Sequence, residues 1–146
     1  MTTTAVDPLP QRIKTLYSLV ATDPAKVLAE LPELYTSDLH FINPVVDLRG
    51  LDAFTAQWKK AFSTYKLFEI VDIEVVGDEQ HFSMTYTMNI RFAFGPTFRM
   101  SLATDFRGRD GKVYYTCDYF DVVGSVLEPF PLLSCLYKKI FGLLVA

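Results

Sequence analysis

The chain has 146 residues, of which 50% are hydrophobic, 14% aromatic and 21% charged. This composition predicts one folded domain over residues 1–146 and excludes a disordered chain, because the apolar content offsets the entropy cost of ordering. The 14 Lys and Arg against 17 Asp and Glu give a net charge of -3 without a basic block. We therefore expect no nucleic-acid partner.

The amino terminus and the cysteines bear on location. Residues 1–5 lack the basic and apolar regions of a secretory signal. Cys117 and Cys135 could pair, but two cysteines without such a signal are more simply free thiols in a reducing compartment. The apolar stretch over 132–145 contains Lys138 and Lys139 and is too short to span a bilayer. We expect a cytoplasmic protein with no transmembrane segment.

Three helices are predicted before residue 66. Asp7-Pro8 offers a capping side chain and an early proline, and apolar residues then recur at helical spacing from Ile13 to Val20. Thr22-Asp23-Pro24 repeats the start signal for a shorter helix, which Pro32 kinks or ends. After Gly50, residues 51–65 keep helical spacing and have a strongly aromatic face.

The second half of the chain changes to the alternating pattern of β-strands. Its strand-like stretches are rich in β-branched and aromatic residues, and short glycine-containing connections force them to be antiparallel neighbours. A shorter strand, ended by Asn43-Pro44, precedes the third helix. The predicted strands span residues 39–42, 67–76, 80–94, 97–107 and 112–123.

One face of the strand over 80–94 is apolar, whereas Thr85, Thr87 and Asn89 take the opposite face. The next strand continues the apolar face, which must be covered, and the three helices are the available cover. The predicted fold class is therefore α+β, with helices on the concave face of a bent antiparallel sheet. The residues of the apolar face are Phe82, Met84, Tyr86, Met88 and Ile90, followed by Phe98, Met100, Leu102, Thr104 and Phe106.

This layout resembles a known family. Three amino-terminal helices, the segment Leu34–Pro44, Gly50 before the third helix and a meander ending Cys117-Asp118-Tyr119-Phe120-Asp121 are similar to SnoaL-like proteins of the nuclear transport factor 2 superfamily. The resemblance covers about residues 8–125. It implies a cone-shaped α+β barrel, a conical pocket between helices and sheet, and a homodimer formed through the outer sheet face. The same cone holds isomerases, polyketide cyclases, epoxide hydrolases, dehydratases and non-catalytic binding modules.

The resemblance makes Asp118 the candidate catalytic residue. Ketosteroid isomerases use the carboxylate of an Asp-Pro pair, where this chain has Asn43-Pro44, and an amide takes no proton at neutral pH. Thr116–Asp121 matches the last four positions of the limonene epoxide hydrolase motif Trp-Arg-Asp-Tyr-Phe-Asp, but Thr85–Asn89 lacks the Arg and Asp of that family's earlier strand. Polyketide cyclases use an acid/base Asp on the last strand, which Asp118 fits at least as well.

The residues alone also support Asp118. Strand alternation places Asp118 and Asp121 on opposite faces, so one of them should face the pocket. A carboxyl group among Met and Phe side chains loses solvation, which raises its pKa towards values useful for proton transfer. The alternative is that the carboxylate pairs with an arginine across the strands, or lies at a wet rim.

We expect the pocket to bind a hydrophobic molecule of steroid, terpenoid or polyketide size. His40 and His81 lack metal-ligand spacing and no nucleotide-binding glycine motif is present, so we expect no metal and no cofactor. A tyrosine at helical spacing also suits an ordinary core. The candidate ligand-binding residues are Tyr17, Tyr35, Asn43, Trp58, Phe62, Met84, Tyr86, Met88, Met100, Leu102, Thr116 and Phe120.

The carboxyl-terminal residues, about 130–145, predict an apolar helix interrupted by Lys138 and Lys139. Such a helix packs against the domain or a dimer mate, covers the pocket as a lid, or offers a patch to a membrane or partner. Two functions are therefore open. One is a cofactor-independent isomerase, cyclase or hydrolase with Asp118 as acid/base, and the other is a non-catalytic ligand-binding or dimerisation module.

Overall fold

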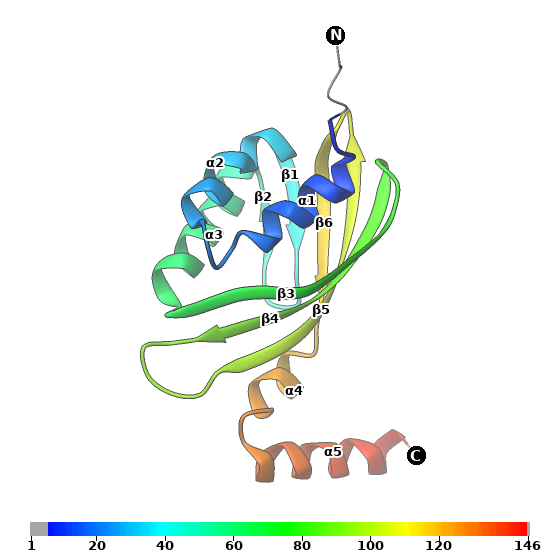
Figure 1. Ribbon diagram of the computed structural model, residues 1–146. Coiled ribbons are helices and arrows are strands. Elements are labelled where there is room, and N and C mark those ends of the chain that lie inside the picture. Colours follow the sequence, from blue (N-terminus) through cyan, green and yellow to red (C-terminus); the bar gives the residue numbers. More distant parts are fainter. Residues whose placement is uncertain (1–5, 146) are drawn as a thin grey trace.

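The structure of the protein, a computed structural model, describes residues 6–145. Helices α1 (Leu9–Ser18), α2 (Pro24–Leu34) and α3 (Leu51–Thr64) cover one face of a strongly bent sheet (Figure 1). The three predicted amino-terminal helices are thus confirmed. Residues 1–5, on which the expectation of no secretory signal rests, lie outside the described part of the chain.

The amino-terminal N–H groups of the first two helices have hydrogen-bond partners of different kinds. The sequence predicts Asp7 as the cap of α1, but the proline after it takes that position without a side-chain hydrogen bond. Instead, the Leu9 N–H donates to Glu79 Oε1 at 2.7 Å, so a residue distant in sequence satisfies the helix end. In α2 the predicted cap is present, because Asp23 Oδ1 accepts from the Lys26 N–H at 3.0 Å.

The strands form one mixed sheet in the order β2-β1-β6-β5-β4-β3. The expectation of an antiparallel sheet holds for every neighbouring pair except β1 and β6, which run parallel. Helix α3 and the meander separate β1 from β6, so no short hairpin fixes their direction. The strands are β1 (Tyr35–Ile42), β2 (Asp47–Arg49), β3 (Leu67–Gly77), β4 (His81–Arg91), β5 (Phe98–Arg109) and β6 (Lys112–Tyr119).

The end of the sheet departs from the prediction. Strand β6 ends at Tyr119 rather than at residue 123, and a short unpredicted helix, α4 (Val122–Leu127), follows. The cause is local, because Asp121 Oδ1 accepts from the Gly124 N–H at 2.8 Å and so caps α4. Helix α5 (Pro131–Val145) corresponds to the predicted apolar helix and lies beyond the end of the cone (Figure 1).

Strand β4 has the predicted alternation. Phe82, Met84 and Tyr86 are buried on the side that the helices cover. Thr85 and Thr87 lie on the opposite side, where they line a hollow on the outer sheet face. The predicted α+β class is therefore confirmed, and the concave side of the sheet is the place for a cavity.

Candidate functional site

A cavity of about 310 Å³ lies between the helices and the concave face of the sheet. Its volume is at the lower end of the range for small-molecule pockets, roughly 300–1,000 Å³. Apolar and aromatic side chains dominate its wall, as the sequence predicts. The lining residues are Tyr17, Phe41, Asn43, Val45, Phe54, Gln57, Trp58, Ala61, Tyr65, Phe68, Ile70, Tyr86, Met88, Ile90, Met100, Leu102, Asp118, Phe120 and Val122.

Most of the predicted site residues lie on this wall. Tyr35, Met84 and Thr116 do not, because they are buried in the core behind it. Phe62 packs outside the cavity against Trp58. The residues that the structure brings together at the cavity are Tyr17, Asn43, Trp58, Tyr86, Met88, Met100, Leu102, Asp118 and Phe120.

Several lining residues were not among the predicted site residues. Phe54, Ala61 and Tyr65 lie on the aromatic face of α3 together with Trp58, so helical spacing was a signal that could have found them. Val45 follows the turn after β1, and no local pattern places it there. Val122 belongs to α4, whereas the sequence predicts it as part of the strand over 112–123.

Among the described residues that line the cavity, Asp118 is the one carboxylate. Its Oδ1 accepts a hydrogen bond from Thr104 Oγ1 at 2.7 Å, and the register of β5 and β6 pairs these two residues. Burial raises the pKa of Asp118 to about 6, against the opposing effect of the Thr104 hydrogen bond. Among residues 6–145 no Lys, Arg or His forms an ion pair with it, so the alternative of an arginine partner is not realised.

A short hydrogen-bonded chain leads from Asp118 into the sheet. Tyr86 Oη lies 3.1 Å from Thr104 Oγ1. Because Thr104 donates its hydrogen to the carboxylate, it accepts from the Tyr86 hydroxyl. Burial, followed by the nearby charge of Asp118, raises the pKa of Tyr86 well above its ordinary value. Tyr86 is therefore a neutral donor that helps to fix the position of the carboxyl group.

Tyr17 brings a second hydroxyl-bearing ring to the cavity. Its ring packs edge-on against Tyr86, with centroids 5.5 Å apart, and against Trp58 at 5.6 Å. Burial raises the pKa of Tyr17 well above its ordinary value, so its hydroxyl stays protonated at neutral pH. The position of Tyr17 is compatible with both predicted roles, an ordinary core residue and a ligand-binding residue.

Asn43 has a structural task at the cavity rim. Its Oδ1 accepts from the N–H groups of Val45 and Val46 at 2.9 Å and 2.8 Å, which shapes the connection between β1 and β2. Its amide oxygen is thus occupied, and the NH₂ group is the part left to meet a ligand. A proton-accepting role for Asn43 has no support in this geometry.

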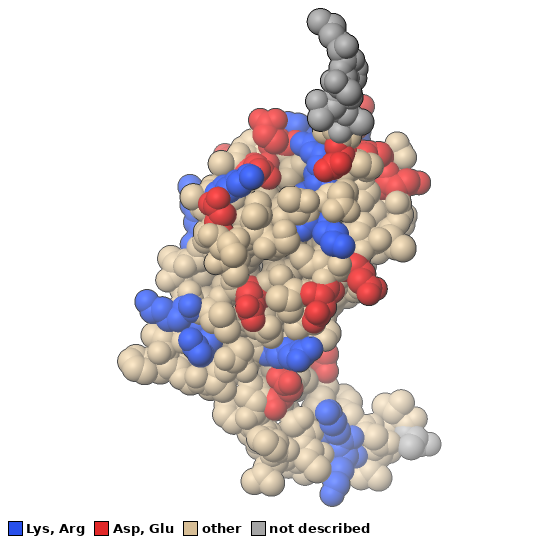
Figure 2. Space-filling model, in the orientation of Figure 1, with Lys and Arg blue, Asp and Glu red and all other residues tan. Residues whose placement is uncertain are grey.

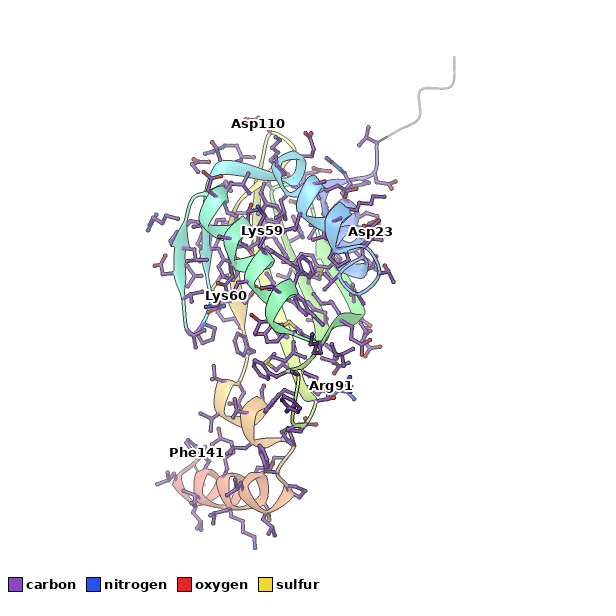
Figure 3. All side chains as sticks on the ribbon, turned by 90° about the vertical axis from the view of Figure 1, so that its left-hand side faces the viewer. Asp23, Lys59, Lys60, Arg91, Asp110 and Phe141 are labelled. Atoms are coloured by element: carbon purple, nitrogen blue, oxygen red, sulfur yellow. The ribbon has the colours of Figure 1, made fainter. Side chains whose placement is uncertain are left out.

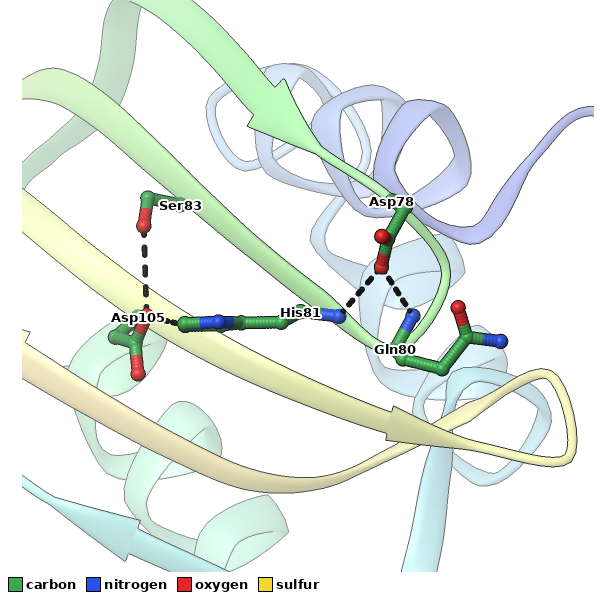
Figure 4. A network of polar contacts seen from close by, with 5 residues as sticks. All are labelled: Asp78, Gln80, His81, Ser83 and Asp105. Atoms are coloured by element: carbon green, nitrogen blue, oxygen red, sulfur yellow. Dashed lines mark hydrogen bonds and ion pairs between the residues drawn. The ribbon is translucent and has the colours of Figure 1, made fainter.

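A second polar cluster lies on the outer face of the sheet (Figure 4). His81 Nε2 and Ser83 Oγ both contact Asp105 Oδ1, at 2.6 Å and 3.4 Å. A nucleophilic serine needs a histidine as its hydrogen-bond acceptor, whereas Ser83 donates to the carboxylate. The cluster is therefore a hydrogen-bonded group rather than a triad, and the described residues hold no group of three potential metal ligands.

Helices packed on a strongly bent sheet, with an apolar cavity between them, define a ketosteroid isomerase-like fold of the nuclear transport factor 2 type. The sequence profile of the SnoaL-like domain matches residues 15–116, and the chain belongs to this family. The resemblance stated from the sequence is confirmed. No curated protein matches the chain.

Solved structures share the fold. A protein of Pseudomonas putida, provisionally assigned as a polyketide cyclase, has a TM-score of 0.69 and 19% identity over 84% of this chain and 98% of that chain. TsrD of Streptomyces laurentii has a TM-score of 0.69 and 17% identity over 82% of this chain and 92% of that chain. A hypothetical protein of Catenulispora acidiphila with a ketosteroid isomerase-like fold, in complex with trimethylamine, has a TM-score of 0.67 and 15% identity over 82% of this chain and 91% of that chain. At these identities the likeness concerns the fold alone.

Proposed function

We propose that this protein binds a compact hydrophobic molecule in its cavity and moves a proton on it with Asp118, as a cofactor-independent isomerase or cyclase. The observation that carries this proposal is a carboxyl group with a pKa of about 6 in an apolar cavity, without a cationic partner among the described residues. The assignment of a similar structure as a polyketide cyclase supports it.

The proposed chemistry needs one group that accepts and returns a proton. At neutral pH most Asp118 side chains are ionised, because the pKa of about 6 lies below 7. The carboxylate takes a proton from a carbon next to a carbonyl group and gives it back elsewhere on the same molecule, so no redox partner is required. Thr104 and Tyr86 hold the carboxylate, and Tyr17 is the proposed hydrogen-bond donor to the ligand's carbonyl oxygen.

A hydrolase is less well supported. Hydrolysis of an epoxide requires groups that hold and activate a water molecule, and the cavity has a single carboxylate for that task. The cyclase or isomerase proposal needs only that carboxylate and a hydrogen-bond donor.

The test is proton exchange at carbon. We would incubate the protein with a panel of cyclic ketones and short β-diketones in D₂O and follow loss of the α-proton signals by NMR. We expect a rate that rises with pH and levels off above an inflection near pH 6, the pKa of Asp118. Asp118→Asn should remove the inflection. Exchange that is equal in the variant and the parent protein would contradict the proposal.

A non-catalytic binding module is the second candidate. The specific observation in its favour is Asn43, since the residue at the position of the isomerase base has its oxygen engaged in a turn. In that case a ketone binds, as seen from chemical-shift changes of cavity residues, but its α-protons exchange no faster than they do in buffer. The same NMR samples therefore discriminate the two functions.

We also propose a homodimer formed through the outer sheet face. The hollow on this face is bordered by Tyr119, whose side chain is 58% exposed. Its floor carries Thr85, Thr87 and Ser101, short side chains that allow close approach of a second sheet. Sedimentation velocity should give a dimer, and Thr85→Lys, at an exposed position of the same hollow, should give a monomer. A monomeric parent protein at high micromolar concentration would refute this proposal.

A cytoplasmic location is proposed as well. Its support is that Cys117 and Cys135 are both free. In the described part of the chain, no helix is long and apolar enough to cross a membrane. Thiol labelling of the protein in intact and in permeabilised cells would test it, because Cys135 is exposed.

A further inference from the structure

Helix α5 exposes an apolar surface that the rest of the described chain does not cover. None of residues 131–145 is buried, and Leu132 and Leu143 are 87% and 84% exposed. The main packing partner of α5 is the short helix α4, and Figure 3 shows Phe141 on a helix that lies well away from the cone. A surface of this kind marks a contact with another molecule or with lipid.

The side chains of α5 are sorted around the helix. At about 3.6 residues per turn, Ser134, Cys135, Lys138 and Lys139 fall on one side. Apart from Val145, which falls on the polar side, the apolar side chains occupy the other half of the circumference, which is the pattern of helices that lie in a membrane interface. They are Leu132, Leu133, Leu136, Tyr137, Ile140, Phe141, Leu143 and Leu144.

The charge of α5 has one sign. Lys138 and Lys139 are the charged residues of the segment 131–145, which has no Asp or Glu. Figure 2 shows a basic strip on the lowest part of the molecule, where α5 lies in Figure 1. Arg91, another cation, lies level with α4 in Figure 3, and Glu128 borders the same hollow as Lys138 and Lys139.

The mouth of the cavity opens at the same end. Val122, the first residue of α4, lines the cavity, as does Val45, whose side chain is 66% exposed. Phe94, which is 93% exposed, lies in the connection between β4 and β5 at this end of the cone (Figure 1). Exposed apolar side chains thus lie both on α5 and at the rim of the cavity, at the same end of the molecule.

We propose that this end of the molecule docks on an anionic lipid surface, with α5 lying flat between the headgroups and the acyl chains. With 15 residues, α5 is too short to span a bilayer, which takes about 20. A lipid monolayer accepts the whole apolar half of the helix, while the two lysines extend along the border of the apolar half to reach phosphate groups. The cationic segment fits a lipid surface of opposite charge.

A second copy of the chain matches α5 less well. Such a partner must offer a groove that is both apolar and acidic. The acidic hollow of this protein, on the outer sheet face, contains Asp72 and Glu74, but polar Thr85, Thr87 and Ser101 also line it. That floor does not complement a half-circumference of leucine, isoleucine and phenylalanine.

Docking orients the cavity mouth towards the lipid, so a hydrophobic ligand passes into the cavity without crossing water. This consequence rests on the proposed function, whereas the docking itself does not. Asp118→Asn should therefore bind lipid as the parent protein does, even if the proton-exchange test fails.

The experiment is co-sedimentation of the full chain with vesicles of phosphatidylcholine, with or without phosphatidylglycerol. We expect binding to the anionic vesicles that weakens as salt is added. The double variant Lys138→Gln with Lys139→Gln should bind roughly thirtyfold more weakly, because each basic residue near an anionic surface contributes about a fivefold factor. The matched control changes Lys59 and Lys60, an adjacent exposed pair on α3, to Gln and should bind normally.

A second variant removes apolar contacts. Leu136→Ser with Ile140→Ser should abolish binding without unfolding the protein, since both side chains are already exposed. Absence of binding to anionic vesicles, or binding that neither α5 variant reduces, overturns the proposal. The proposal is also overturned if the parent protein is a dimer in sedimentation velocity and the serine variant is a monomer, because a second copy then covers α5.

Discussion

The two faces of the β5–β6 pair hold carboxylates with different surroundings. Thr104, the residue before Asp105, pairs in register with Asp118, so the two acids lie close along the sheet but on opposite faces. Asp105 contacts His81 Nε2 at 2.6 Å on the outer face. Asp118 meets a hydroxyl donor and an apolar cavity, and burial raises its pKa to about 6. One step along a strand thus separates a carboxylate hydrogen-bonded to a histidine on the outer face from a carboxyl group in an apolar cavity.

The largest difference is expected in catalysis. Asp118→Asn should lower the rate of α-proton exchange by at least about a hundredfold, the usual contribution of a positioned proton-transfer group. Asp105→Asn makes the same chemical change on the other face and should leave the rate within about twofold. NMR exchange rates in D₂O measure both variants. Equal losses of exchange rate in the two would contradict the expectation that only the inner-face carboxylate transfers the proton.

The second difference concerns stability and pH. Because the folded-state pKa of Asp118 is raised from 3.8 to about 6, the folded protein holds this proton more tightly than the unfolded chain does. The resulting stabilisation is fully present below pH 3.8 and is lost as the pH rises through 6. Ionised Asp118 therefore lowers the free energy of unfolding at neutral pH by up to about 3 kcal/mol.

Urea unfolding between pH 5 and 8 checks this linkage. Relative to the parent protein, Asp118→Asn should gain stability as the pH rises through about 6. If the stability difference between the two proteins is constant over this range, the pKa of Asp118 in the folded protein lies outside it.

A smaller effect is expected at Thr104. Its hydrogen bond opposes the rise in the pKa of Asp118, so Thr104→Val should raise that pKa further, by up to about one unit. The inflection of the exchange rate should move to higher pH by the same amount. Carboxyl ¹³C NMR titration measures the pKa directly, and a decrease would show that the hydroxyl group acts in another way.

The sequence predicts the inner face better than the rim. Period-2 alternation assigns Met88 and Met100 to the cavity side, and helical spacing gives α3 its aromatic face. Those patterns act over many residues, so one exception does not disturb them. The rim depends on single local interactions instead. The Asp121 cap that starts α4 and the Asn43 turn that positions Val45 each rest on one side chain, which no periodic signal records.

Contacts between segments far apart in the chain also cannot be predicted from the sequence pattern. The parallel contact of β1 with β6 and the hydrogen bond from Leu9 to Glu79 join segments that only the folded chain brings together. The hydroxyl of Thr104 is a similar case. Its position on the apolar face is predictable, but its bond to Asp118 depends on the register of two strands.

The smallest effect is expected on the outer face. The His81–Asp105 pair is exposed on the histidine side, where the side chain is 63% accessible, so water screens the interaction. His81→Gln should therefore change the free energy of unfolding by less than about 1 kcal/mol and leave proton exchange unaltered. Thr104→Val removes one hydroxyl on the inner face of the same strands and moves the pH profile. If His81→Gln also shifts the inflection near pH 6, the two faces are electrostatically coupled and the carboxylates do not act separately.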